Sequence, residues 1–208
     1  NWQYEKLSIG DVVFRDYDSH IVQHGVFSQL EYSKDRITAF VSGTLATSRY
    51  WRYDRFYYDA AHAKSDTKNF ASGSIKGGLN YNIDRYNNVF ANVGYISRAP
   101  FFSGGVFLMS QSSNEINKDA VNEKAFSFEL GYGLRYKWLY VALNAYFTKW
   151  MDKTTSKSGY INNNTELYTM SMTGVNAKHM GVEFDVVARP TPYVTLKGML
   201  SLGNWRWD

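Results

Sequence analysis

The sequence predicts an all-β protein, an antiparallel up-and-down transmembrane β-barrel of which this chain supplies about eight strands. Apolar and polar residues alternate with a period of two along several segments, the repeat of strands whose two faces meet different surroundings. The connections between these segments are alternately short and long, as in a membrane barrel with tight turns at one end. Aromatic residues make up 17% of the 208 residues, which suits the aromatic girdles of such a barrel.

The composition argues against several other classes of protein. The mean hydropathy is negative, and no apolar run approaches the roughly 18 residues that a transmembrane helix needs. The chain has no cysteine, so neither a disulfide framework nor a thiolate metal site is expected. The net charge of +4 is mild and the basic residues are dispersed, except around Arg49, Arg52 and Arg55, so nucleic acid is not an expected partner.

A hairpin near the middle of the chain shows the alternation most clearly. Apolar residues occupy every second position of 126–136 and again of 139–147, with small or polar residues between them. A two-residue turn through Lys137-Trp138 would pair Tyr136 with Leu139 and bring both apolar rows to one face. Each strand then has about ten residues, the length that crosses a bilayer when tilted.

The first predicted hairpin lies nearer the start of the chain. Residues 1–20 give no clear strand, although three apolar residues there fit one that begins earlier. A strand runs from Val22 to Tyr32, and a tight turn at Lys34-Asp35 pairs Tyr32 with Ile37. The return strand continues to Leu45 with its apolar residues on the same face.

Two further hairpins complete the predicted set. Strands at 75–83 and 89–95 are joined by a short turn at 84–87, and strands at 182–188 and 194–202 by a turn at Pro190-Thr191-Pro192. The predicted long loops are 49–69, 99–123 and 151–176, the last with a strand extension at 166–172.

The alternation of connections separates a membrane barrel from a soluble all-β sandwich. A sandwich has no reason to keep every second connection tight, whereas a barrel in an outer membrane has short turns on one side and long loops on the other. A tyrosine or tryptophan also lies beside each short turn, as an interfacial belt requires. These residues are Tyr32, Tyr81, Tyr136, Trp138 and Tyr193.

No catalytic, cofactor or metal site is predicted. His62 lies near Asp59 and Asp66 in the first long loop, an arrangement that could bind a metal but is more simply a set of solvated loop residues. The strand carboxylates are expected on the lumen face, in a hydrated wall paired with basic residues. These carboxylates are Glu129, Glu183 and Asp185, and the expected basic partners are Lys76, Arg135 and Arg189.

The long loops carry the predicted ligand contacts. Residues 49–58 place aromatic rings beside guanidinium groups, a combination that suits an anionic, glycan or aromatic ligand. Residues 98–102 end the fourth strand, where Pro100 stops the hydrogen-bond ladder. The candidate ligand-binding residues are Arg49, Trp51, Arg52, Tyr53, Arg55, Tyr57, Arg98, Phe101 and Phe102.

Several segments resemble the barrel of TonB-dependent outer-membrane receptors, particularly the type common in Bacteroidetes. The matching segments are 76–83, 88–95, 128–132, 144–150 and 178–184. The resemblance implies a bacterial outer-membrane protein whose barrel of about 22 strands is closed by an N-terminal plug. It also implies contact with outer-membrane lipid and with the inner-membrane TonB energy complex, through the plug. The implied ligand is a scarce nutrient such as a siderophore, haem, cobalamin, a peptide or a glycan.

The chain departs from that family pattern in its length. A barrel of 22 strands needs about 500 residues, whereas 1–208 holds about eight strands, no recognisable plug and no energy-coupling peptide. The start of the chain has no signal-peptide pattern. We therefore expect a mature chain or a fragment, and interpret 1–208 as a single partial domain of a transporter barrel, without enzymatic activity or cofactor.

Two alternatives stay open at the level of sequence. The first is a complete eight-stranded barrel that acts as a surface anchor or adhesin, since the strand count matches. The second is an outer-membrane hydrolase on a barrel, which would need a converging nucleophile and base that the sequence does not suggest.

Overall fold

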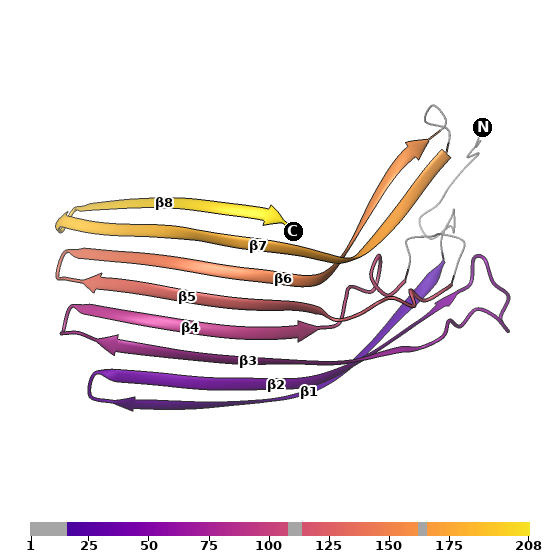
Figure 1. The fold of residues 1–208 in the computed structure, drawn as a ribbon, viewed down its shortest axis with the longest axis horizontal. Coiled ribbons are helices and arrows are strands. Elements are labelled where there is room, and N and C mark those ends of the chain that lie inside the picture. The colour runs from indigo at the N-terminus through magenta and orange to yellow at the C-terminus, as the bar shows by residue number, and fades with distance from the viewer. Residues whose placement is uncertain (1–15, 108–113, 162–165) are drawn as a thin grey trace.

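The computed structural model describes residues 16–107, 114–161 and 166–208. These residues form one antiparallel sheet of eight strands in which each strand pairs with its neighbour in the chain (Figure 1). The prediction of an all-β, up-and-down sheet is therefore confirmed. The strands are β1 Tyr17–Lys34, β2 Ile37–Asp54, β3 Lys68–Asn82, β4 Asn87–Arg98, β5 Glu123–Arg135, β6 Leu139–Ile161, β7 Glu166–Thr191 and β8 Val194–Trp207.

The sheet is open. Among the described residues, β1 pairs only with β2 and β8 pairs only with β7. The eight strands therefore do not close into the complete small barrel considered above. Both outer strands present free backbone donors and acceptors, which hydrocarbon would not satisfy without further strands.

The two ends of the sheet differ in their connections. Four short turns lie together at one end, and the long connections lie at the other (Figure 1). At the long end, the paired ends of β6 and β7 bend away from the rest of the sheet (Figure 1). The predicted alternation of short and long connections is thus observed for the first two long loops, 55–67 and 99–122.

The third predicted loop, 151–176, is wrong except for its strand extension at 166–172, which lies within β7. Most of 151–176 is a two-stranded extension, because β6 continues to Ile161 and β7 begins at Glu166. Register shifts between Trp150 and Lys153, with Asp152 at a φ of 56°, mark where the extension begins. In the β6 part, residues 152–159 are polar or small and show no alternation, so that the pattern predicts no strand there.

The first turn also differs from its prediction. Lys34 pairs with Ile37, so the turn lies at Asp35-Arg36 and Tyr32 faces Ala39. Asp35 has a φ of 52°, a left-handed conformation that Asp adopts more readily than most residues. The shift moves the pairing by two residues, and the apolar residues therefore stay on the predicted face.

The last turn differs similarly, whereas the central one is as predicted. Thr191 pairs with Val194, which places the turn at Pro192-Tyr193, and the register is irregular between Ala188 and Thr191. In the central hairpin, the Tyr136 amide donates to the Leu139 carbonyl over 2.7 Å and the Leu139 amide donates back over 3.2 Å.

One face of the sheet carries the predicted apolar rows, and we call it the apolar face. A typical row joins Val93, Phe128, Phe147 and Met180 across four strands. Leu30 and Leu45 are each 71% exposed, and no helix or second sheet covers this face in the described residues. An apolar surface of this extent is far larger than a soluble monomer exposes.

The opposite face, called the polar face here, also holds aromatic rings that the alternation does not predict. Phe40 lies directly opposite Gly78, and Phe90 lies directly opposite Gly131. A side chain at either glycine would collide with the neighbouring ring. The two glycines therefore let large rings lie across the strands of the polar face.

The buried core lies at the loop end, on the polar face. Tyr50 of β2 and Phe70 of β3 pack against Val106, Phe107 and Ala120 of the segment 99–122. Its described residues, 99–107 and 114–122, are fixed by backbone hydrogen bonds of their own as well as by this packing. These parts of the second long loop thus fold over the polar face.

No helix in the described part of the chain is long and apolar enough to cross a membrane.

Candidate ligand-binding site at the loop end

A cavity of 560 Å³ lies between the polar face and the start of the segment 99–122. β1, β2 and β3 contribute mostly small or polar residues. Among them is Gln23, whose side-chain amide donates to the Ser48 hydroxyl over 3.2 Å. The opposite wall is formed by 98–102. This cavity brings together three of the predicted candidates, namely Arg98, Phe101 and Phe102.

Arg98 combines a structural contact with an accessible surface. Its guanidinium donates to one carboxylate oxygen of Glu123 over 2.7 and 3.1 Å. The Glu123 side chain is only 2% exposed, whereas that of Arg98 is 46% exposed. The buried carboxylate requires this partner, yet one side of the guanidinium still faces the cavity.

Two aromatic rings flank this guanidinium. The guanidinium carbon lies 5.2 Å from the ring centre of Phe101 and 5.9 Å from that of Trp150. Both distances fit cation–π contact. Trp150, near the end of the regular β5–β6 pairing, was not among the predicted candidates, because only its strand register places it beside Arg98.

The adjacent phenylalanines have different roles. Phe101 is 64% exposed. Phe102 packs with its ring centre 4.6 Å from that of Phe107 and 6.0 Å from that of Tyr50. Phe101 is therefore available to a ligand, while Phe102 mainly holds the segment on the sheet.

Arg52 is a structural residue of the loop end. It is 5% exposed, and its Nε donates to the Asn114 side-chain oxygen over 2.5 Å. Its guanidinium also lies 4.9 Å from the ring centre of Phe107 and 5.3 Å from that of Tyr17. Arg52 thus joins β1 and β2 to the second long loop.

Arg49, Trp51 and Tyr53 lie on the opposite side of the strand from Arg52, continuing the apolar face. His20 stacks on Trp51 with ring centres 5.0 Å apart, and the Arg49 guanidinium lies 5.6 Å from the same tryptophan ring. The predicted run 49–58 is therefore not one patch. Because β2 continues to Asp54, the period of two divides the run between both faces.

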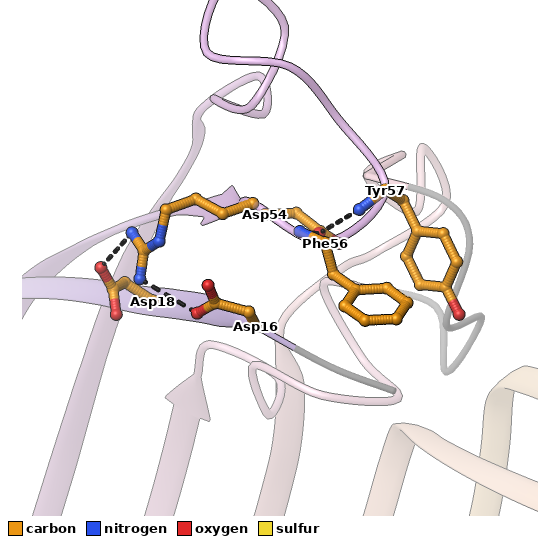
Figure 2. A network of polar contacts seen from close by, with 6 residues as sticks. Asp16, Asp18, Asp54, Phe56 and Tyr57 are labelled. Carbon is orange, nitrogen blue, oxygen red and sulfur yellow. Dashed lines mark hydrogen bonds and ion pairs between the residues drawn. The ribbon is translucent and has the colours of Figure 1, made fainter. Parts of the chain in front are cut away.

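Arg55 and Tyr57 belong to the turn that follows β2 (Figure 2). The Arg55 guanidinium donates to Asp18 over 2.7 Å and to Asp16 over 3.3 Å, and the hydrogen bond from Arg55 lowers the pKa of Asp18. The Tyr57 amide donates to the Asp54 carboxylate over 3.2 Å. Both candidates thus have contacts that stabilise the turn, and the structure brings neither to the cavity beside Arg98.

A second cleft, of 650 Å³, lies between the first and second long loops. Three of its lining residues are Lys64, Lys68 and Lys118, and the Lys68 ammonium donates to the Lys118 carbonyl over 3.3 Å. No local pattern predicts this cleft, since its two sides are about fifty residues apart in the chain.

His62 forms a pair with Asp59 rather than a cluster. Its Nδ1 lies 2.7 Å from Asp59 Oδ1, and this contact holds the pKa of Asp59 below its usual value. Asp66 does not join them, and in the described ranges no three histidine or carboxylate residues are close enough to hold a metal ion together.

The polar-face carboxylates lie where predicted but lack the predicted partners. Glu129 accepts a hydrogen bond of 3.1 Å from the Asn92 side-chain amide, Nδ2. Within the described residues, Glu129, Glu183 and Asp185 form no ion pair with the expected cations. These strand charges face an open, solvated side, which leaves little to hold them in contact.

No family model matches the chain, and no curated protein matches it by sequence. Its fold is similar to solved structures of TonB-dependent outer-membrane transporters. The copper transporter OprC has 16% identity and a TM-score of 0.68, with 91% of this chain and 30% of OprC covered. The FrpB iron transporter from Neisseria meningitidis (F3-3 variant) has 15% identity and a TM-score of 0.63, with 91% and 26% covered.

A third structure agrees with these two. The alcaligin outer-membrane receptor FauA from Bordetella pertussis has 14% identity and a TM-score of 0.63, with 92% of this chain and 31% of FauA covered. The chain thus spans less than a third of the length of these structures. Identities this low show the fold alone, and that fold is a fragment of the transporter barrel.

Proposed function

We propose that the chain forms part of the barrel wall of a TonB-dependent receptor in the outer membrane of a Gram-negative bacterium. One observation carries the proposal: an open sheet with one apolar and one polar face, tight turns at one end and long loops at the other. Its match to about a third of such transporter structures supports the same assignment. Further strands, outside this chain, pair with β1 and β8.

The orientation in the membrane follows from the two faces and the two ends. The apolar face contacts lipid and the polar face lines the lumen, since only the first is rich in exposed Leu, Val and Phe side chains. The short turns lie on the periplasmic side and the long loops outside the cell. Residues 99–107 and 114–122 of the second long loop then fold into the lumen near the extracellular mouth.

The receptor takes up a scarce nutrient rather than catalysing a reaction. The ligand binds at the extracellular mouth, against the cavity walled by Arg98 and Phe101. A plug domain outside this chain gates the lumen and meets the inner-membrane TonB energy complex. No cofactor takes part.

The chemistry of the cavity suggests an anionic ligand with flat apolar parts. A guanidinium flanked by the exposed ring of Phe101 and the half-buried ring of Trp150 attracts carboxylate or phenolate oxygens and stacks against planar groups. Siderophores, haem, cobalamin, peptides and glycans are the classes to test first. We also propose that the receptor is of the type common in Bacteroidetes, which segments such as 76–83 and 88–95 resemble.

Uptake by the complete receptor tests the function. Radiolabelled candidates from these five classes are given to cells with and without the inner-membrane energy complex. We expect accumulation of one ligand to fall to background without the complex, while binding to the cell surface remains. Accumulation that continues without the energy complex would contradict the proposal, and surface adhesion without uptake would favour the anchor or adhesin.

The cavity is tested separately with the ligand found in that way. Phe101→Ala in the complete receptor removes an aromatic contact and is expected to weaken binding about two- to tenfold. Phe56→Ala is the matched control, since Phe56 is also partly exposed but lies outside the cavity. Equal affinity of the two variants would place the ligand elsewhere.

A further inference from the structure

Three basic residues lie side by side in one row on the apolar face. Lys149 of β6 is directly opposite Lys178 of β7, which is directly opposite Arg206 of β8. Lys124 of β5 lies on the same face. It precedes Phe126, the residue that pairs with Lys149, by two positions. We call Lys124, Lys149, Lys178 and Arg206 the basic row.

The basic row lies where the apolar rows end. The neighbouring row toward the short turns joins Phe147, Met180 and Asn204, and the next joins Ala145, Val182 and Leu202. Lys149 follows Leu139, the first residue of β6, by ten residues. Ten residues of a tilted strand rise by about 25 Å, the height of the apolar band of a membrane barrel.

Four cations so close together are costly unless anions accompany them, since like charges directly opposite each other destabilise a sheet. Two carboxylates are present. Lys178 lies 2.7 Å from Asp208, and Lys124 lies 2.7 Å from Asp152. In the described part of the chain, neither Lys149 nor Arg206 has a carboxylate within ion-pair distance.

We propose that the basic row binds the phosphate groups of an anionic lipid of the outer leaflet, whose acyl chains lie along the apolar rows below. Arg206 can donate two hydrogen bonds to one phosphate, and the lysines supply further charge. This inference rests on the proposed membrane placement, because that placement puts the row at the level of the lipid head groups.

Two features favour a lipid over a free anion. The row is continuous with the hydrocarbon-facing surface, so that a phosphate attached to acyl chains gains contacts that a free phosphate cannot make. The row is also local. Lys149 lies ten residues from the short-turn end of its strand. At about the same distance from the short turns, β1, β2 and β3 carry His24, Thr47 and Ala71 on the apolar face, which offer no such cluster of charge.

The test uses the complete protein in neutral detergent. Three probes are titrated: bisphosphorylated lipid A, phosphatidylcholine and inorganic phosphate. We expect binding of lipid A that weakens with salt, and little binding of the other two. The triple variant Lys149→Gln, Lys178→Gln, Arg206→Gln should bind lipid A about a hundredfold more weakly.

The matched control carries the same change in charge on the polar face, as Lys76→Gln, Arg135→Gln, Lys197→Gln, and should bind lipid A like the unmodified protein. The row variant should fold and insert normally, because it loses mutual repulsion together with one partly exposed ion pair, Lys178–Asp208, and the apolar rows are unchanged. Lys149→Gln alone, expected to bind about fivefold more weakly, gives the same answer with a smaller perturbation.

Several results would overturn the inference. They are unchanged lipid A binding in the row variants, an equal loss in the control, and inorganic phosphate binding as tightly as lipid A. Its failure is distinguishable from failure of the proposed function. Proteins that insert into membranes and transport ligand without binding lipid A refute only the basic row, whereas a protein that does not insert refutes the placement itself.

Discussion

The two ends of the sheet are held together in different ways. At the turn end, each connection is closed by residues a few positions apart, as in the paired hydrogen bonds of 2.7 and 3.2 Å between Tyr136 and Leu139. At the loop end, buried side-chain contacts join distant parts of the chain. The bond between Arg52 and Asn114 spans 62 positions.

Because of this difference, one end of the sheet fixes the strand register, while the exposed residues of the other end are free to vary. The short turns fix the register of each hairpin with little loop-closure entropy, and they need no side-chain core. The long loops require a small core of their own, built on Tyr50, Phe70 and Phe107. The exposed residues of such a loop, and the contacts that they offer, can vary while the sheet below stays the same. The predictions below test this contrast.

The largest effect is expected at the core of the loop end. Phe107 is 1% exposed, so Phe107→Ala should lower the free energy of opening the segment 99–122 by about 3–5 kcal/mol. Amide hydrogen exchange of the Val106 and Phe107 backbone bonds measures this opening. Phe101→Ala, at an exposed site in the same segment, should change it by less than about 0.5 kcal/mol. Equal effects would show that the segment is not held by its core.

The next effect concerns the ion pair that anchors the second long loop. Arg98→Ala leaves the buried Glu123 carboxylate without its partner. We expect a loss of about 2–3 kcal/mol in chemical denaturation, less than for a fully buried pair because half of the arginine is exposed.

The double variant Arg98→Ala, Glu123→Gln should recover much of that loss, since the buried charge is removed as well. A double variant no more stable than Arg98→Ala would mean that the charge of Glu123 is already solvated.

A smaller effect is expected at the first short turn. Asp35 has a φ of 52°, which a β-branched residue adopts poorly, so Asp35→Val should cost about 1–2 kcal/mol in denaturation of the complete barrel. Asp35→Gly serves as the control and should be neutral or stabilising. If valine were tolerated like glycine, the turn would not depend on its left-handed residue.

The smallest effect is a dependence on pH at the second short turn. Asp84 accepts hydrogen bonds from the Tyr86 amide over 2.7 Å and the Asn87 amide over 2.9 Å. The bond from Tyr86 is the main reason why the pKa of Asp84 is lowered. Its contribution is therefore present above the unfolded pKa of about 3.9 and is lost as the pH falls through the lower folded value.

Hydrogen exchange at the Asn87 amide, followed over that acidic range, measures this contribution. Asp84→Asn should remove the dependence on pH at this amide and leave the other short turns unchanged. An amide whose protection varies equally with pH in both proteins would rule out Asp84 as the cause.

Much of the sheet was predictable because its information is local. The alternation through 126–136 and 139–147 determined which residues share a face. The first turn lies one residue later than predicted, at Asp35-Arg36, and this changes the pairing by two residues, so the faces stay the same. The extension of β7 at 166–172 was predicted, whereas that of β6 was missed because residues 152–159 are polar or small and do not alternate. In the candidate site, the sequence pointed to Arg98, Phe101 and Phe102, which line one cavity, and had no signal for Trp150 or for the lysine cleft.

By itself, the amino-acid sequence determined that this protein is a two-faced antiparallel sheet, because period-two alternation can be satisfied only by strands between unlike surroundings. Only the tertiary structure decided which loop residues meet. It divided the run 49–58 between two faces, buried Arg52, and aligned Lys149 with Lys178 and Arg206. Those outcomes depend on register and loop closure over tens of residues, which no local pattern records.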